Sequence, residues 1–180
     1  MHSCQNRRSF LLGAAGMSLC SAPVVGKAEA QVARPNGYVL GPTEGEHLIQ
    51  RGGNIFIKAA PTTGSGGLAM GTQQILAGVG IPIHRHFHMD EAFYVIDGGG
   101  TFILDDVRHP IQKGASIFIP KNAWHGFENA ERELLLLWIV APAGLEVFFR
   151  EVAARPGVAR SPRTKEQLNE IARKHAMEFR

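Results

Sequence analysis

Between residues 54 and 141 the chain consists of short apolar or alternating runs that are separated by turn residues. The runs occupy residues 54–59, 68–76, 92–96, 101–104, 116–119, 124–127 and 133–140. The turn residues that separate them include glycines, an Asp-Asp pair, a Lys-Gly pair and an Asn-Ala pair. Residues 61–67 read as a loop. Many short strands at such spacing are typical of all-β sandwiches and barrels. The pattern therefore predicts a mainly β domain of one of these two kinds.

Two features of this region give sharper expectations. The three glycines at 98–100 predict a break between two strands. The continuous apolar run at 134–140 (LLLLWIV) predicts a strand that is buried on both faces, and it is too short to span a membrane.

The last 40 residues change to a helical period. Leu145, Phe148, Phe149 and Val152 are spaced as one face of a helix that follows Pro142. Residues 155–163 read as a linker. This helix and the one described next could cover the β domain, close the mouth of a barrel or form a homodimer interface. The pattern does not choose among these three roles.

A second helix is expected to begin near Thr164. Thr164 and Gln167 have the spacing of a capping box. One predicted stripe of this helix contains Leu168, Ile171, Ala172, His175, Ala176 and Phe179.

The first 30 residues carry the features of an export signal. Arg7 and Arg8 precede Ser9, Phe10 and Leu11, a moderately apolar run continues to Val25, and Ala28-Glu29-Ala30 forms a cleavage pattern. This segment resembles a twin-arginine signal peptide that is cleaved near Ala30. Glycine, serine and proline interrupt the apolar run, which argues against the alternative of an uncleaved membrane anchor. We therefore expect a periplasmic or secreted protein with no membrane segment in its mature form.

The predicted signal peptide, or leader, also accounts for most of the net charge. The whole chain has a net charge of +3, but three basic residues and one acidic residue lie in the leader, so the remainder is close to neutral. That balance gives no indication of a nucleic-acid partner. Both cysteines, Cys4 and Cys20, also lie in the leader. Disulfides, thiolate ligands and cysteine nucleophiles are therefore not expected in the mature protein.

The candidate chemistry is concentrated between Gly78 and Gly98. His84 and His86 are two positions apart, so on a strand both imidazoles point to one side of a sheet. Glu91 follows closely. His125 lies in a second cluster, beside Trp124. The question is whether these two clusters form one site.

The spacing of these residues resembles two motifs of the cupin superfamily. The first motif is complete: Gly78, five residues, His84-x-His86, four residues, Glu91, six residues and Gly98. The second runs from Gly114 through Pro120 and His125 to Asn129, but Asn122 stands where the family normally has glycine. Asn is the residue other than glycine that best tolerates positive φ, so the turn is expected to be retained. The resemblance covers residues 54–141.

The resemblance implies an antiparallel jelly-roll β-barrel that binds one divalent metal through His84, His86, Glu91 and His125. Three imidazoles and a carboxylate suit Mn, Fe, Ni, Co, Cu or Zn and can leave coordination positions open. Twin-arginine export carries folded proteins, so the metal would be acquired in the cytoplasm. That order favours Mn or Fe.

The resulting division is a signal peptide at 1–30, a lead-in segment at 31–53, the cupin barrel at 54–141 and a C-terminal helical extension at 142–180. Alternation from Glu91 and His125 makes Phe93 and Phe127 candidates for the pocket wall. His88 and Asp90 are expected at the rim of the site. Ordinary surface or helix-face positions are expected for His47, His109 and His175.

The small bacterial cupins that resemble quercetin dioxygenase are the most similar group, on the stretches DEAFYVIDG and PKNAWHGFEN. This likeness implies a metal-dependent, dioxygenase-like oxidoreductase acting on a small hydroxylated or aromatic substrate, with Glu91 as a catalytic base. A metal-dependent decarboxylase, isomerase or hydrolase on the same site is an alternative. So is a metal-containing protein that binds a small ligand without catalysis.

Overall fold

The computed structural model describes residues 37–128 and 132–180. The predicted signal peptide, with Cys4 and Cys20, lies outside these ranges, as does Asn129 of the second motif. The division of the chain at residues 30, 53 and 141 remains a prediction.

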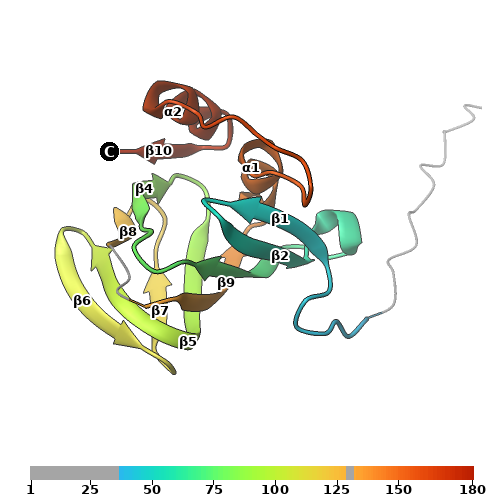
Figure 1. Ribbon diagram of the computed structural model, residues 1–180, viewed down its shortest axis with the longest axis horizontal. Helices are drawn as coiled ribbons and strands as arrows, with labels where there is room; N and C mark the ends of the chain where they lie inside the picture. The colour runs from blue at the N-terminus through green and yellow to red at the C-terminus, as the bar shows by residue number, and fades with distance from the viewer. Residues whose placement is uncertain (1–36, 129–131) are drawn as a thin grey trace, which may run out of the picture. The chain divides into compact units, whose positions relative to one another are not determined.

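The described residues form a curled antiparallel sheet and two helices, as the sequence predicts (Figure 1). The sheet order is β1-β2-β3-β9-β5-β8-β4-β10, and β6 and β7 also pair with β5. The strands are β1 (Glu46–Gln50), β2 (Gly53–Ala59), β3 (Ala69–Ile75), β4 (Ile81–His86), β5 (Asp90–Leu104), β6 (Val107–Gln112), β7 (Ser116–Ile119), β8 (His125–Glu128), β9 (Leu134–Ala141) and β10 (Met177–Phe179). A short 3-10 helix, η1 (Pro61–Thr63), follows β2.

The long strand β5 connects the two halves of the sheet. Residues 90–98 pair with β9, and residues 99–104 pair with β6. The predicted break at 98–100 is therefore wrong, because the strand continues through the glycines. Gly98 has a φ of +85°, and a Cβ there would lie 1.9 Å from the backbone oxygen of Glu133. Glycine thus lets the strand change partners at a close backbone approach instead of ending it.

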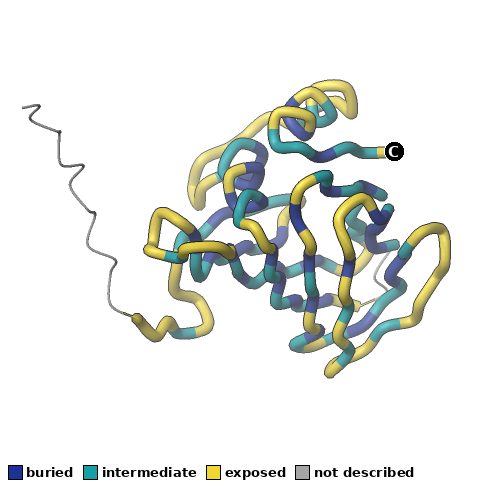
Figure 2. Tube along the Cα trace, turned by 180° about the vertical axis from the view of Figure 1, so that it is seen from behind, coloured by how far each residue is buried: buried dark blue, intermediate teal, exposed yellow. Residues whose placement is uncertain are grey.

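The core lies between the two halves of the curled sheet. Along β9, Leu134, Leu136, Trp138 and Val140 are buried, while the residues between them are partly exposed. The same alternation is visible along the strands in Figure 2. The apolar run at 134–140 is thus buried on one face only, which corrects the expectation of burial on both faces. Its outer face is apolar without being fully covered by the described residues.

Two strands had no clear signal in the sequence. β1 lies within the predicted lead-in segment and pairs with β2. β6 contains Pro110 and is mostly exposed, so it has no apolar alternation. Proline is tolerated there because β6 pairs only with β5.

The C-terminal segment begins with two helices, α1 (Leu145–Val152) and α2 (Lys165–Lys174). The capping box of Thr164 and Gln167 is confirmed. The helix ends at Lys174, however, so His175, Ala176 and Phe179 do not belong to its apolar stripe. Ala176 has a φ of +52°, which stops the helix, and the next three residues form β10.

Strand β10 pairs with β4, so the end of the chain extends the sheet. Met177 lies opposite His86, and Phe179 lies opposite His84. Helix α1 packs on the barrel through Phe149, whose ring is 5.5 Å from that of Trp138. Figure 1 shows α1, α2 and β10 together at the same end of the domain as β4. The described C-terminal residues cover this end of the barrel, and a role in a homodimer interface stays a prediction. Neither helix has the length and apolar character that crossing a membrane would require.

Candidate metal centre

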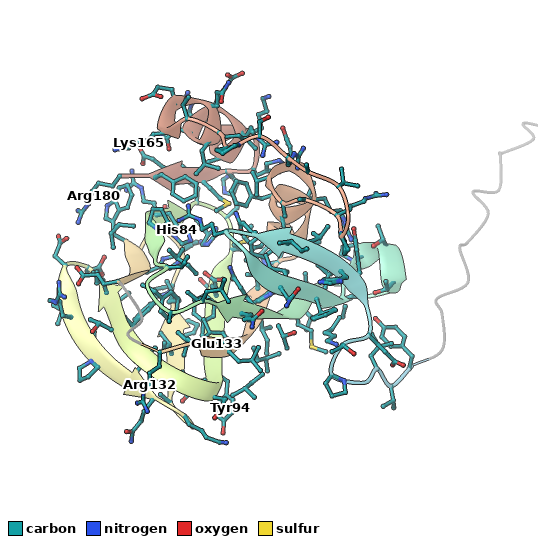
Figure 3. All side chains as sticks on the ribbon, in the orientation of Figure 1. His84, Tyr94, Arg132, Glu133, Lys165 and Arg180 are labelled. Atoms are coloured by element: carbon teal, nitrogen blue, oxygen red, sulfur yellow. The ribbon has the colours of Figure 1, made fainter. Side chains whose placement is uncertain are left out.

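Four polar side chains meet inside the barrel near this end. They are His84 and His86 of β4, Glu91 of β5 and His125 of β8. One potential ligand atom from each lies within 4.8 Å of those of the other three, and all four residues are buried. His84, labelled in Figure 3, lies beside β10. The structure therefore brings together the two clusters that the sequence placed far apart.

Strand pairing explains this convergence. His84 of β4 is directly opposite His125 of β8. Alternation turns His84 and His86 inward, whereas Arg85 between them forms an ion pair with Glu178 of β10. Glu91 is held from both sides, because it pairs with Ile119 of β7 and Val140 of β9. Each side chain is thus positioned by a strand and not by a loop.

Hydrogen bonds orient two of the imidazoles. Nδ1 of His84 lies 2.8 Å from the carbonyl oxygen of Pro82, and Nδ1 of His125 lies 3.0 Å from that of Ala123. Because a carbonyl only accepts, each Nδ1 carries the proton and donates it. In the neutral rings, Nε2 is therefore free to act as a ligand, which is the orientation usual for metal-binding histidines.

Glu91 is the centre of the cluster. Its Oε2 lies 3.1 Å from Nε2 of His86 and 3.0 Å from Nε2 of His125. Nδ1 of His86 is buried without a hydrogen-bond partner among the described residues. Nitrogen and oxygen atoms with lone pairs that gather in one buried space can coordinate a cation, and buried charges are either paired or coordinate metals.

The protonation states also suit a metal. Burial, followed by repulsion from the protonated forms of His125 and His86, lowers the pKa of His84 well below its usual value. Burial alone would raise the pKa of Glu91, but the nearby imidazoles of His86 and His125 bring it below the usual range. A neutral imidazole and an ionised carboxylate are the forms that coordinate a divalent ion. The four residues therefore fit one divalent transition metal, while their geometry does not identify which metal.

A small cavity borders the cluster. It has a volume of about 40 Å³, and His84 and Glu91 form part of its wall. The barrel adds Gln73 and Phe93, and the C-terminal elements add Phe148, Phe149, Met177 and Phe179. This volume accommodates roughly three water molecules. The cavity is therefore a small, largely apolar space next to the candidate ligands.

The other predicted site residues divide into two groups. Phe93 lines the cavity, as expected, whereas Phe127 does not. Phe127 packs against Phe93, with the two ring centroids 5.4 Å apart, and lines a different pocket together with Ile81. His88 and Asp90 are exposed and outside the cluster. Asp90 accepts a hydrogen bond from the backbone nitrogen of Lys121 at 2.9 Å.

The remaining histidines have other surroundings. His47 stacks on Phe56 and contacts Asn54, and His109 lies on the exposed strand β6. His175 follows α2 and its Nε2 lies 2.7 Å from Glu151.

Sequence reasoning missed Gln73 and the C-terminal contribution to the cavity. Gln73 lies on β3 between inward-facing Gly71 and Ile75, and strand alternation alone could have placed it inside. It is a buried polar residue with only 8% of its surface exposed. The positions of Met177 and Phe179 could not have been found in this way, since they depend on the pairing of β10 with β4.

Comparisons with known proteins agree with this geometry. Residues 71–140 match the family described as a cupin domain. These residues include all four members of the cluster.

The match supports the cupin superfamily. A cupin structure from Shewanella frigidimarina, described as RmlC-like, covers 63% of this chain and 96% of its own, with a TM-score of 0.53 and 17% identity. At that identity the likeness concerns the fold alone.

Two curated proteins are similar in sequence to shorter stretches of this chain. Protein SchB of Streptomyces halstedii is 37% identical over 81 residues, which are 44% of this chain and 59% of that protein. An uncharacterised protein of Methanocaldococcus jannaschii is 32% identical over 65 residues, 33% of this chain and 52% of that protein. The chain thus spans just over half the length of these relatives.

The sequence resembles the second cupin motif except at Asn122, and there the backbone adopts a conformation that favours glycine. Asn122 has a φ of +70°, as the sequence predicts for a residue in the glycine position. Its backbone nitrogen donates a hydrogen bond to the carbonyl oxygen of His86 at 2.7 Å. The turn therefore supports the strand end that carries a candidate ligand.

This turn gives a testable prediction. Asn122→Gly should leave the free energy of unfolding nearly unchanged, because glycine adopts positive φ readily. Asn122→Val should lower it by about 1–3 kcal/mol, because a β-branched residue is strained there. Urea unfolding followed by circular dichroism measures both. A valine variant as stable as the parent would show that the turn relaxes to another conformation.

Proposed function

We propose that this protein is an exported, metal-dependent cupin enzyme, a dioxygenase-like oxidoreductase that acts on a small hydroxylated or aromatic substrate. The observation that carries the proposal is the cluster of three imidazoles and one carboxylate, two members of which, His84 and Glu91, form part of the wall of a small, largely apolar cavity. A structural zinc site uses all of its coordination positions for protein ligands, and a site meant only for structure needs no adjoining cavity.

His84, His86, Glu91 and His125 would hold the metal, with Mn or Fe favoured by loading in the cytoplasm. When bound, the ion would polarise a substrate hydroxyl or enol oxygen and offer an open position beside the cavity. The chain's own residues position the substrate and move its proton. Phe93, Phe148 and Phe149 exclude water from that space.

Glu91 is the proposed base. Histidines occupy its Oε2, whereas its Oε1 accepts no hydrogen bond from the described residues. Its lowered pKa keeps the carboxylate ionised at neutral pH, the form that can accept a proton, and also makes it a weaker base than an ordinary glutamate. In this proposal a substrate O–H transfers its proton to Oε1, and the side-chain amide of Gln73 orients the substrate.

The size of the cavity restricts the substrate. With a volume of about 40 Å³, the cavity is smaller than a flavonol, so a substrate of that size would require the C-terminal elements to move. A catechol also exceeds the space of about three water molecules, whereas the smallest hydroxy and keto acids exceed it least. Export through the twin-arginine route, a small-molecule partner and the absence of a nucleic-acid partner belong to the same proposal and rest on the sequence.

The test is turnover by protein purified with its native metal. We expect oxygen consumption and an oxygenated product with at least one member of a panel of catechols, flavonols and dicarboxylates. Glu91→Gln should lower the rate by about 10²- to 10⁴-fold, the usual effect of losing a general base. His88→Ala, which changes an exposed neighbour, is the control and should retain the rate.

Two other outcomes would replace this reaction. Product formation without oxygen consumption would assign a decarboxylase, isomerase or hydrolase to the same site. Stoichiometric ligand binding without any turnover would identify a non-catalytic binding protein.

A further inference from the structure

A second cavity lies next to the metal cavity and has a different character. Its volume is about 480 Å³, and it is formed by the turn between β1 and β2 and by the linker that joins α1 to α2. Three arginines line it: Arg51 from the turn, and Arg160 and Arg163 from the linker, with Ser161 between them. None of the described residues that line this cavity is Asp or Glu. Its wall is therefore strongly positive.

The hydrogen bonds of these arginines leave their charge uncompensated. Arg160 donates to the carbonyl oxygen of Ala153, and Arg163 donates to those of Val152 and Glu151. Arg51 donates to the carbonyl oxygen of Gly80 at 3.1 Å. These acceptors are neutral, and a guanidinium has five N–H donors, so each arginine retains at least three.

The carboxylate of Glu151 does not remove the excess charge. It lies 2.7 Å from Nε2 of His175. Burial, followed by the charge of Arg160, lowers the pKa of Arg163, and Glu151 opposes this effect. Two positive groups that disfavour one another beside a cavity favour the binding of an anion.

The two cavities share part of their wall. Gln50 and Arg51 line both of them. A ligand whose acidic end contacts the arginines would therefore lie against the same residues that border the metal cavity. Carboxylates and phosphates match the planar fork of arginine through paired hydrogen bonds.

We propose that the arginine-lined cavity binds the carboxylate or phosphate end of a small organic anion and forms the outer part of the substrate site. The assignment of the anion as substrate rests on the proposed function, whereas anion binding itself does not. It names the substrate class as acidic and makes Arg51, Arg160 and Arg163 recognition residues.

Calorimetric titration of the metal-loaded full chain tests this binding, with inorganic phosphate and succinate as probes. We expect saturable 1:1 binding of at least one probe, and the tighter probe identifies the oxyanion. Arg160→Gln and, separately, Arg51→Gln should each weaken binding about tenfold or more, as expected for a charge-assisted pair worth 1.5–3 kcal/mol. Arg155→Gln is the matched control, because Arg155 is exposed on the same linker and does not line the cavity. It should change the dissociation constant less than twofold.

The same titration with His86→Ala separates this site from the metal. Binding that persists in this variant supports the arginine site even if the proposed enzyme activity fails. Binding that disappears with the metal would overturn the proposal, because the anion would then be a metal ligand. An equal loss in Arg155→Gln, or no saturable binding of either probe, would also overturn it. Two variants on opposite walls keep the test valid if one of them does not fold.

Discussion

His86→Ala is expected to abolish tight metal binding. His86 is 2% exposed, faces the cluster from β4 and lies within hydrogen-bonding distance of Glu91. Losing even a residue that supports a metal ligand costs 10- to 100-fold in affinity, so removing a ligand should cost more than about 100-fold. Elemental analysis after gel filtration and competition with a chelator measure the change.

The chain supplies a matched control for this experiment. His88 is two positions further along, is exposed and lies outside the cluster. His88→Ala should bind metal as the parent does. A His86→Ala protein with unchanged metal content and affinity would refute the ligand assignment. Loss of metal in both variants would point instead to a general disruption of the turn after β4.

Trp138→Ala is expected to have the largest effect on stability. Trp138 is fully buried in β9 and packs against Phe149 of α1. Its indole also fills the space above Gly71, where an added Cβ would lie 2.5 Å from the ring. Truncating a large aromatic residue in such a position should lower the free energy of unfolding by about 3–5 kcal/mol.

The cost should come from packing alone. Nε1 of Trp138 has no hydrogen-bond partner among the described residues, so the substitution breaks no polar contact. Urea unfolding followed by circular dichroism measures the change. Phe118→Ala is the control, because Phe118 is 64% exposed and its truncation should cost less than about 0.5 kcal/mol. Equal effects of the two substitutions would contradict the packing argument.

The apolar and polar pattern was informative wherever a strand buries one face. It placed β2, β3, β7 and β9 within one or two residues of their observed bounds, because alternation records which side chains face the core. It failed at β6, whose residues are mostly exposed, and at residues 98–100, where glycine permits a change of strand partners. Local composition does not distinguish a glycine that ends a strand from one that bends it.

The candidate metal centre was accessible from the sequence for a related reason. Three of its four members lie within eight positions on β4 and β5, which are consecutive in the chain, and the fourth comes from β8, which lies between these two strands in the sheet. Regular spacing on strands fixes the direction of each side chain, so the motif carries geometric information. Phe127 was misplaced because alternation gives the direction of a side chain and not which cavity it borders.

By itself, the sequence determined the mainly β architecture, the capping of α2, the positive φ of Asn122 and the set of four residues that meet in the barrel. Only the tertiary structure decided that β10 closes the barrel mouth beside His84, and that Arg51 shares a cavity with Arg160 and Arg163. The first group depends on local periodicity, on backbone preferences and, for the four residues, on the resemblance to the cupin motifs. The second depends on contacts between segments about 100 residues apart, whose pairing is set by the packing of the whole domain.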